Sequence, residues 1–104
     1  MGTINSKIKG EDIELLFEAI LKLENKDECY KFFEDIATIT ELKSLSQRIW
    51  VAKLLKEKKT YTEIAEETGA STATISRVNR CLNYGSDGYK IILDRINNEK
   101  VVNK

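Results

Sequence analysis

Residues 60–82, TYTEIAEETGASTATISRVNRCL, decide the fold of this chain. They predict two short helices joined by a tight turn at Gly69, because glycine adopts the positive φ that ends a helix at no steric cost. The first helix is acidic, whereas the second has no acidic residue and carries Arg77 and Arg80 among small hydroxyl side chains. This is the outline of a helix-turn-helix, whose second helix enters the major groove of DNA.

The spacing of residue types within this stretch supports the same motif. The inward positions of the two helices are hydrophobic: Ile64, Ile75, Val78 and Leu82. Ala65 falls where the two helices approach closely, so that a small side chain fits there. Thr60 and Glu63 have the spacing of a capping box, and Ser71 is a good N-cap for the second helix.

The outward positions predict the contacts with DNA. They carry small, polar or basic side chains: Ser71, Thr72, Ala73, Ser76, Arg77, Asn79 and Arg80. The first turn is expected to reach base edges, where Thr72 and Ser76 can form hydrogen bonds and Ala73 can meet a thymine methyl group. Asn79 and Arg80 are expected to contact phosphates. A hairpin used only for packing is the alternative, but packing does not require this polar and basic face.

The rest of the chain predicts four more helices, giving an all-α fold in a single domain over residues 1–104. There is no proline, and apolar residues recur at helical spacing. The first helix is expected from Glu11 to about Leu23, after a polar lead-in over 1–10. The second is expected to follow a break at Asn25 and Lys26, with Asp27 as its N-cap.

The third and last helices complete the six. Thr38 and Glu41 predict a second capping box, which opens a helix over 39–57. Its expected core stripe is Leu42, Leu45, Ile49, Ala52 and Leu55, extended by Trp50, Val51 and Leu54. A loop is expected after Leu82, followed by a C-terminal helix over 86–98 that Ser86 or Asp87 caps, and then a loose tail.

Composition narrows the classes of function. The net charge is zero, but residues 1–40 carry a net charge of −4 and residues 41–104 one of +4, which suggests that the second part meets an anion. There is no histidine, and the two cysteines have no zinc-ligand spacing, so no metal site, catalytic residue or enzyme activity is predicted. Cys81 is expected to be buried. No apolar run is long enough for a membrane span, and a cytoplasmic location is expected.

The chain resembles the tryptophan-repressor superfamily, and specifically its YerC/YecD branch of TrpR-related proteins. The run GASTATISRVNRCLNYG carries the resemblance, together with QRIWVAKLL before it. The resemblance implies a TrpR-like fold and an intertwined homodimer in which residues 11–57 form the dimerisation helices. The predicted function is therefore a transcriptional regulator, most simply a repressor, that binds a pseudo-palindromic site on double-stranded DNA.

The same resemblance implies a place for a small-molecule corepressor. Arg48 and Arg77 match the two arginines between which tryptophan lies in the family, and Thr74 matches a neighbouring contact position. Val78 stands where the repressor has a glycine that makes room for the indole, and Cys81 replaces a serine that contacts the ligand. These two residues argue against tryptophan, so no cofactor is predicted, although another small effector stays open.

The sequence is consistent with two hypotheses of function. The first is the DNA-binding homodimer. The second is a helical protein-interaction module that retains the hairpin without binding DNA, for which the zero net charge is the best support.

Overall fold

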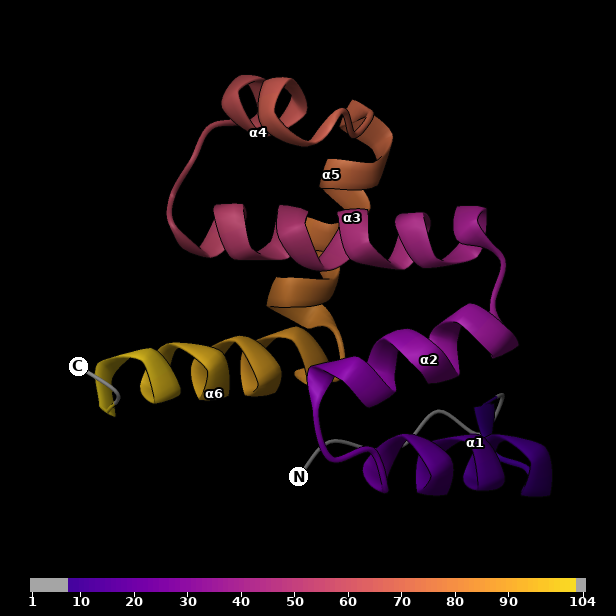
Figure 1. Cartoon of the computed structure of the whole chain (residues 1–104). Coiled ribbons are helices and arrows are strands. Elements are labelled where there is room, and N and C mark those ends of the chain that lie inside the picture. The colour runs from indigo at the N-terminus through magenta and orange to yellow at the C-terminus, as the bar shows by residue number, and fades with distance from the viewer. Residues whose placement is uncertain (1–7, 103–104) are drawn as a thin grey trace. The chain divides into compact units, whose positions relative to one another are not determined.

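The computed structural model describes residues 8–102, which form six α-helices and no strand (Figure 1). The helices are α1 (Glu11–Leu21), α2 (Lys26–Ile36), α3 (Ile39–Lys56), α4 (Tyr61–Thr68), α5 (Thr72–Tyr84) and α6 (Gly88–Val102). The prediction of an all-α fold with six helices is confirmed. Most of the expected lead-in lies outside the described residues. No helix within residues 8–102 is long and apolar enough to span a membrane.

The chain divides into two compact units within α3, after Leu42. The first unit contains α1, α2 and the start of α3. The second contains the rest of α3 and all of α4, α5 and α6, and therefore the whole of the helix-turn-helix.

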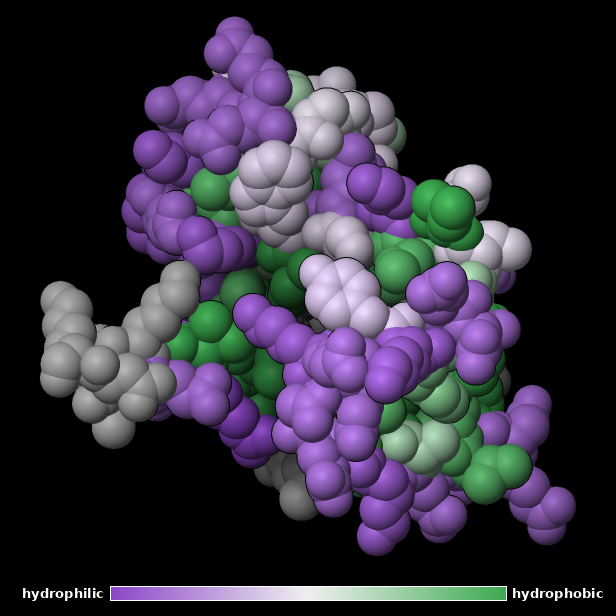
Figure 2. All heavy atoms as spheres, in the orientation of Figure 1, coloured by the Kyte–Doolittle hydropathy of each residue, from purple (hydrophilic) through white to green (hydrophobic). Residues whose placement is uncertain are grey.

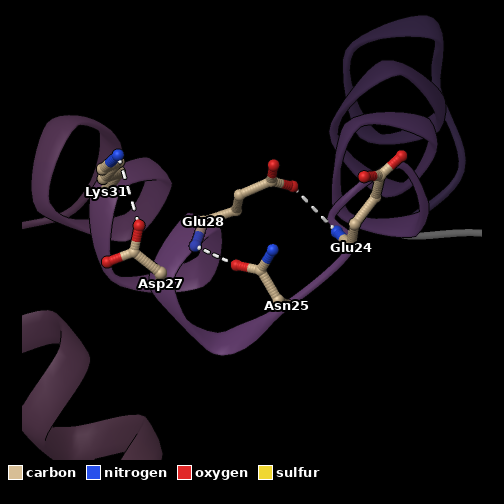
Figure 3. A network of polar contacts seen from close by, with 5 residues as sticks. All are labelled: Glu24, Asn25, Asp27, Glu28 and Lys31. Carbon is tan, nitrogen blue, oxygen red and sulfur yellow. Dashed lines mark hydrogen bonds and ion pairs between the residues drawn. The ribbon is translucent and has the colours of Figure 1, made fainter.

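Asn25 caps α2, and not Asp27 as the sequence suggested. The Asn25 side chain accepts a hydrogen bond from the Glu28 backbone N–H at 2.9 Å, and the Glu28 carboxylate accepts one from the Glu24 N–H at 2.9 Å (Figure 3). Lys26 is thus the first residue of the helix. Asp27 lies in the first turn and pairs with Lys31 across one helical turn, at 3.2 Å. Asparagine is as good an N-cap as aspartate. Because Asn25 caps the helix, the Asp27 carboxylate can pair with Lys31.

Helix α1 ends at Leu21, two residues earlier than expected. The backbone N–H of Lys22 donates to Ala19 and that of Leu23 to Ile20, three residues back, so the last turn is tightened rather than continued. Neither α1 nor α2 has a fully buried residue. Several of their large hydrophobic side chains are exposed: Leu15, Phe17, Leu21, Tyr30 and Ile36. Hydrophobic residues are accordingly visible at the surface in Figure 2.

Both predicted capping boxes are present. The Thr38 N–H donates to the Glu41 carboxylate at 2.8 Å, and the Glu41 N–H donates to the Thr38 hydroxyl at 3.1 Å. Helix α4 opens in the same way, with the corresponding distances between Thr60 and Glu63 at 2.8 and 3.2 Å.

Helix α3 ends at Lys56 in a Schellman-type turn. The Lys59 N–H donates to the Leu54 carbonyl at 3.1 Å, and the Lys58 N–H donates to the Leu55 carbonyl at 3.0 Å. Lys58 occupies the left-handed region, with φ of 67°. The Lys56 ammonium group pairs with the Asp94 carboxylate, which links the C-terminal end of α3 to the middle of α6.

The core of the second unit is built by α3 with the helix-turn-helix and α6. Its buried residues are Val51, Ala52, Leu54, Ile64, Ala70, Ile75, Val78, Leu82 and Leu93. The four inward positions predicted for the helix-turn-helix are all among them. Helix α5 crosses α3 and reaches α6 at its C-terminal end (Figure 1). The helix-turn-helix thus rests on a continuous hydrophobic core within this unit.

The stripe predicted for α3 is correct in part. Its members Val51, Ala52 and Leu54 are buried, whereas Leu45 and Trp50, which were also predicted to face the core, are exposed. Helix α3 is apolar on more than one side, so periodicity alone did not identify the side that the hairpin covers.

Helices α5 and α6 are both longer than predicted. Helix α5 continues to Tyr84 and ends at Gly85, where a Cβ atom would lie 2.4 Å from the Cys81 carbonyl oxygen. Only glycine therefore fits this close approach. Asp87 directly precedes α6 and its carbonyl accepts from the Ile91 N–H. Because neither proline nor glycine follows Gly88, nothing interrupts α6 at residue 98, and it runs to Val102.

Candidate nucleic-acid interface

The turn between α4 and α5 is held by several local hydrogen bonds. Gly69 adopts φ of 74°, and its N–H donates to the Ala65 carbonyl, which ends α4 as predicted. The Thr68 hydroxyl donates to the Ile64 carbonyl at 2.7 Å and accepts from the Ala70 N–H at 3.1 Å. Ala70 is buried, so the hydroxyl provides a partner for an N–H group with little access to water.

Ser71 caps α5, as predicted. Its hydroxyl accepts from the Thr74 N–H at 3.1 Å and donates to the Thr74 hydroxyl at the same distance. The cap fixes the first turn of α5, the turn that carries Thr72 and Ala73. The N-terminus of the helix has no acidic residue in this turn, so its positive dipole end is not neutralised by the chain itself.

The outward face of α5 is exposed and polar. Thr72, Ala73, Ser76, Arg77 and Arg80 are all exposed, whereas Ile75, Val78 and Leu82 on the opposite side are buried. No hydrogen bond or ion pair joins Arg80 to another described side chain. From residue 68 to residue 86 the sequence has no acidic residue. This face combines hydrogen-bonding groups with uncompensated positive charge, which are the groups that contact bases and phosphates.

The acidic side chains of the hairpin lie on α4. Glu63, Glu66 and Glu67 are exposed, and the surface over α4 is mostly hydrophilic in Figure 2. Glu63 is occupied in the capping box. The hydrogen bond from the Thr60 backbone N–H, followed by that with the Thr60 side chain, holds the pKa of Glu63 below its ordinary value.

Asn79 lies apart from the exposed face. It is half-buried, and its side-chain oxygen accepts a hydrogen bond from the Asn83 amide at 3.3 Å, as its carbonyl does at 2.9 Å. It lines a surface hollow together with residues from the end of α3 and from α6: Leu55, Lys56, Lys58, Leu82, Asn83, Lys90 and Asp94. Of the predicted DNA contacts, the structure does not group this one with the others.

Arg48, Thr74 and Arg77 line a common hollow, although 26 residues separate Arg48 from Thr74 in the sequence. Val78, Cys81 and Tyr89 complete its wall, and its volume is about 190 Å³. Pockets for small ligands are usually larger, about 300–1,000 Å³. Neither arginine forms a salt bridge with a described residue.

Tyr89 is the residue of this hollow that the sequence did not reveal. Burial raises the pKa of its hydroxyl group, the nearby Cys81 adds to the increase, and Arg48 and Arg77 act in the opposite direction. The phenol is therefore neutral near pH 7 and does not compensate the two guanidinium charges. Cys81 is exposed, which corrects the prediction that it is buried. Val78 is buried and occupies space at the edge of the hollow.

Gln47 is a second residue whose role the sequence did not reveal. Its side-chain amide donates to the Thr68 carbonyl at 3.2 Å, from α3 to the turn of the hairpin. The signal for it was a polar side chain that interrupts an otherwise apolar stripe, but periodicity does not indicate which distant carbonyl such a residue reaches.

Comparison with known proteins gives consistent matches over most of the chain. The family model of the Trp repressor protein matches residues 11–97. Protein YerC of Bacillus subtilis (strain 168) is 56% identical over 90 residues, which are 86% of this chain and 86% of that protein.

Two solved structures have the same fold. A TrpR-like protein from Eubacterium eligens ATCC 27750 is 60% identical, with a TM-score of 0.86 over 89% of this chain and 96% of that one. A candidate Trp repressor from Staphylococcus aureus is 56% identical, with a TM-score of 0.84 over 88% of this chain and 91% of that one.

Proposed function

This chain belongs to the Trp repressor family, and from that premise we propose that it is a sequence-specific DNA-binding regulator of transcription. The observation that carries the proposal is the exposed, acid-free face of α5, presented by a turn and a cap that are each held by side-chain hydrogen bonds. Its N-terminal turn is the part that reads base edges, and Arg77 and Arg80 attract the phosphate backbone.

The regulator acts as a homodimer and most simply as a repressor. Two copies of α5 enter major grooves about 34 Å apart on a pseudo-palindromic site, as paired helix-turn-helix heads do. The exposed hydrophobic side chains of α1 and α2 support this proposal, because an exposed face of this kind is stabilised by a partner surface. Binding to an operator excludes other proteins from it, so repression needs no further activity. The location that we propose for it is the cytoplasm.

The helix-turn-helix binds DNA without tryptophan. Buried Val78 and the small volume of the hollow beside Arg48 and Arg77 leave little room for an indole ring. Cys81 is a weak hydrogen-bonding group where an ammonium partner is needed. The hollow keeps two positive charges and Thr74, so a smaller anionic effector is the ligand class that its chemistry favours.

Selection of DNA from a random pool tests the proposal directly. The purified protein should enrich a pseudo-palindromic sequence, and binding measured by fluorescence anisotropy should weaken as salt rises. Adding tryptophan should leave the affinity unchanged. A tryptophan-dependent affinity would contradict the proposed fit of the hollow.

Charge reversal separates DNA binding from a role in protein interaction. The double variant Arg77→Glu/Arg80→Glu should lose DNA affinity, because two attractive contacts become repulsive. Arg95→Glu, on the exposed surface of α6, is the matched control and should bind nearly as the parent does. If the parent protein selects no DNA at all, the alternative of a protein-interaction module that retains the hairpin is favoured.

A further inference from the structure

A polar contact joins α3 to the turn of the helix-turn-helix. The side-chain amide of Gln47 donates to the Thr68 main-chain carbonyl at 3.2 Å, and both residues are half-buried. The carbonyl belongs to the last residue of α4, where the chain leaves the helix and has no intrahelical partner. Gln47 therefore supplies a donor to a carbonyl that the helix itself leaves unsatisfied.

The carbonyl that Gln47 contacts lies in a segment with little freedom. Thr68 is fixed to Ile64 and Ala70 through its hydroxyl group, at 2.7 and 3.1 Å. Ala70 is buried, and Ser71, the next residue, caps α5. A displacement of the Thr68 carbonyl is therefore passed on to the start of α5, the turn proposed to meet the bases.

The hydrophobic core alone defines the orientation of α5 less precisely than a hydrogen bond does. Val51 and Ala52 on α3 and Ile75 and Val78 on α5 belong to one buried cluster. Burial of apolar area has no preferred direction, so small rotations of the hairpin on α3 change it little. A hydrogen bond weakens steeply as its angle departs from linear. The Gln47 contact thus favours one orientation among several with similar apolar burial.

We propose that Gln47 is a positioning residue that sets the angle at which α5 is presented to DNA. The proposal rests on the proposed function, because the angle of α5 affects binding only if the two copies of α5 in a dimer must enter two half-sites at once. In such a dimer a fixed angle gives a sharp preference for one spacing between half-sites, since both helices must enter their grooves together. If the angle of α5 is less restricted, DNA with other half-site spacings also binds, and the preference for one spacing decreases.

The test compares affinities for two DNA duplexes that differ only in half-site spacing. One carries the spacing selected by the parent protein, and the other has two base pairs inserted at its centre. The measured quantity is the ratio of the two dissociation constants. A uniform change in phosphate attraction cancels in this ratio, so the ratio reports geometry and not total charge.

Gln47→Leu removes the donor while keeping a side chain of similar size. We expect it to reduce the spacing ratio by about three- to tenfold, the range that corresponds to losing one net hydrogen bond. Gln47→Lys restores a donor and should recover most of the ratio. Lys43→Leu, one turn earlier on α3 and exposed, is the matched control and should leave the ratio unchanged.

The possible outcomes distinguish a failure of the proposed function from a failure of the positioning role of Gln47. If the parent protein shows no preferred sequence or spacing, the proposed function fails. If the parent has a spacing preference and Gln47→Leu keeps it, the positioning role is wrong. Gln47→Glu keeps the size and polarity but turns a carboxylate toward the carbonyl, so it should also flatten the preference. Should Gln47→Leu not fold, Gln47→Glu decides the question, and an unchanged ratio there overturns the proposal.

Discussion

Lys58 has the backbone conformation that glycine usually provides at the end of a helix. Its φ of 67° is combined with both hydrogen bonds of a Schellman turn. Left-handed conformations cost non-glycine residues about 1–2 kcal/mol, because Cβ approaches the following carbonyl oxygen. The chain accepts this cost and keeps an exposed cation beside the hollow that Lys56, Lys90 and Asp94 line.

Lys58→Gly should therefore stabilise the protein. We expect the free energy of unfolding in urea to rise by about 0.5–1 kcal/mol, since the relief of strain exceeds the added entropy of the unfolded chain. Lys59→Gly removes the same charge from the next residue, which has no positive φ. It should not stabilise the protein, and equal effects of the two variants would show that charge and not backbone strain is responsible.

Arg80 and Ser76 should affect DNA binding in different ways. Arg80 has no partner among the described side chains, so Arg80→Ala should weaken binding to all sequences alike and lower the salt slope by about two for the dimer, one for each copy of Arg80. Ser76→Ala should change the selected bases and leave the salt slope as it is, because a hydroxyl contributes no charge. Anisotropy titrations over a range of salt, with a selected and a scrambled duplex, measure both effects.

At the scale of elements, the turn between α4 and α5 depends on the Thr68 hydroxyl. Thr68→Val keeps the shape of the side chain but leaves the buried Ala70 N–H without its partner. We expect a loss of about 1–2 kcal/mol in the free energy of unfolding, the usual cost of an unsatisfied buried donor. Thr68→Ser retains the hydroxyl group and should lose much less. Urea unfolding of both variants, followed by circular dichroism, measures the difference.

The two capping boxes make helix stability depend on pH. Backbone hydrogen bonds from Thr38 and Thr60, followed by contacts with their side chains, hold the pKa values of Glu41 and Glu63 below the ordinary 4.5. The folded state thus favours the carboxylates. The stability that they give is complete above the ordinary pKa and is lost as pH falls through the lowered folded value.

Glu63→Gln tests this dependence at α4. The amide cannot lose charge on acidification, so the variant should show a smaller decrease in the free energy of unfolding between pH 7 and about pH 3. Glu66→Gln changes an exposed glutamate of the same helix outside the capping box and should keep the decrease of the parent protein. An identical decrease in the parent and in Glu63→Gln would contradict the contribution of the box.

At the scale of the whole molecule, the first unit has more apolar surface than a single chain covers. Leu21 is 82% exposed and Leu15 66% exposed, and α1 and α2 contain no buried residue. The second unit, in contrast, has a closed hydrophobic core of its own. We therefore expect the first unit to form part of the proposed dimer interface.

Leu21→Asp should weaken the dimer without disturbing the packing of a single chain. A charge replaces a side chain that is exposed in one copy and would be desolvated by a partner. Sedimentation velocity should detect monomer for this variant at concentrations where the parent protein is dimeric. The midpoint of thermal unfolding of the parent should rise with protein concentration. Glu18→Lys, at an exposed polar position of α1, should stay dimeric.

The sequence by itself determined most of the features that depend on neighbouring residues, the N-cap of α2 being an exception. The two capping boxes, the Ser71 cap and the left-handed Gly69 follow from side chains within a few positions of one another, and the structure has all of them. The inward positions of the helix-turn-helix were likewise predictable, because a helix with one polar face has one way to bury the other.

Only the tertiary structure decided the features that depend on distant residues. Helix α3 is apolar on several sides, so which members of its predicted stripe are buried, Val51 and Leu54 but not Leu45, was settled by where the hairpin packs. The contact of Gln47 with Thr68 spans 21 residues. Long-range contacts of this kind depend on how helices pack in space, and helical periodicity carries information only about residues three or four positions apart.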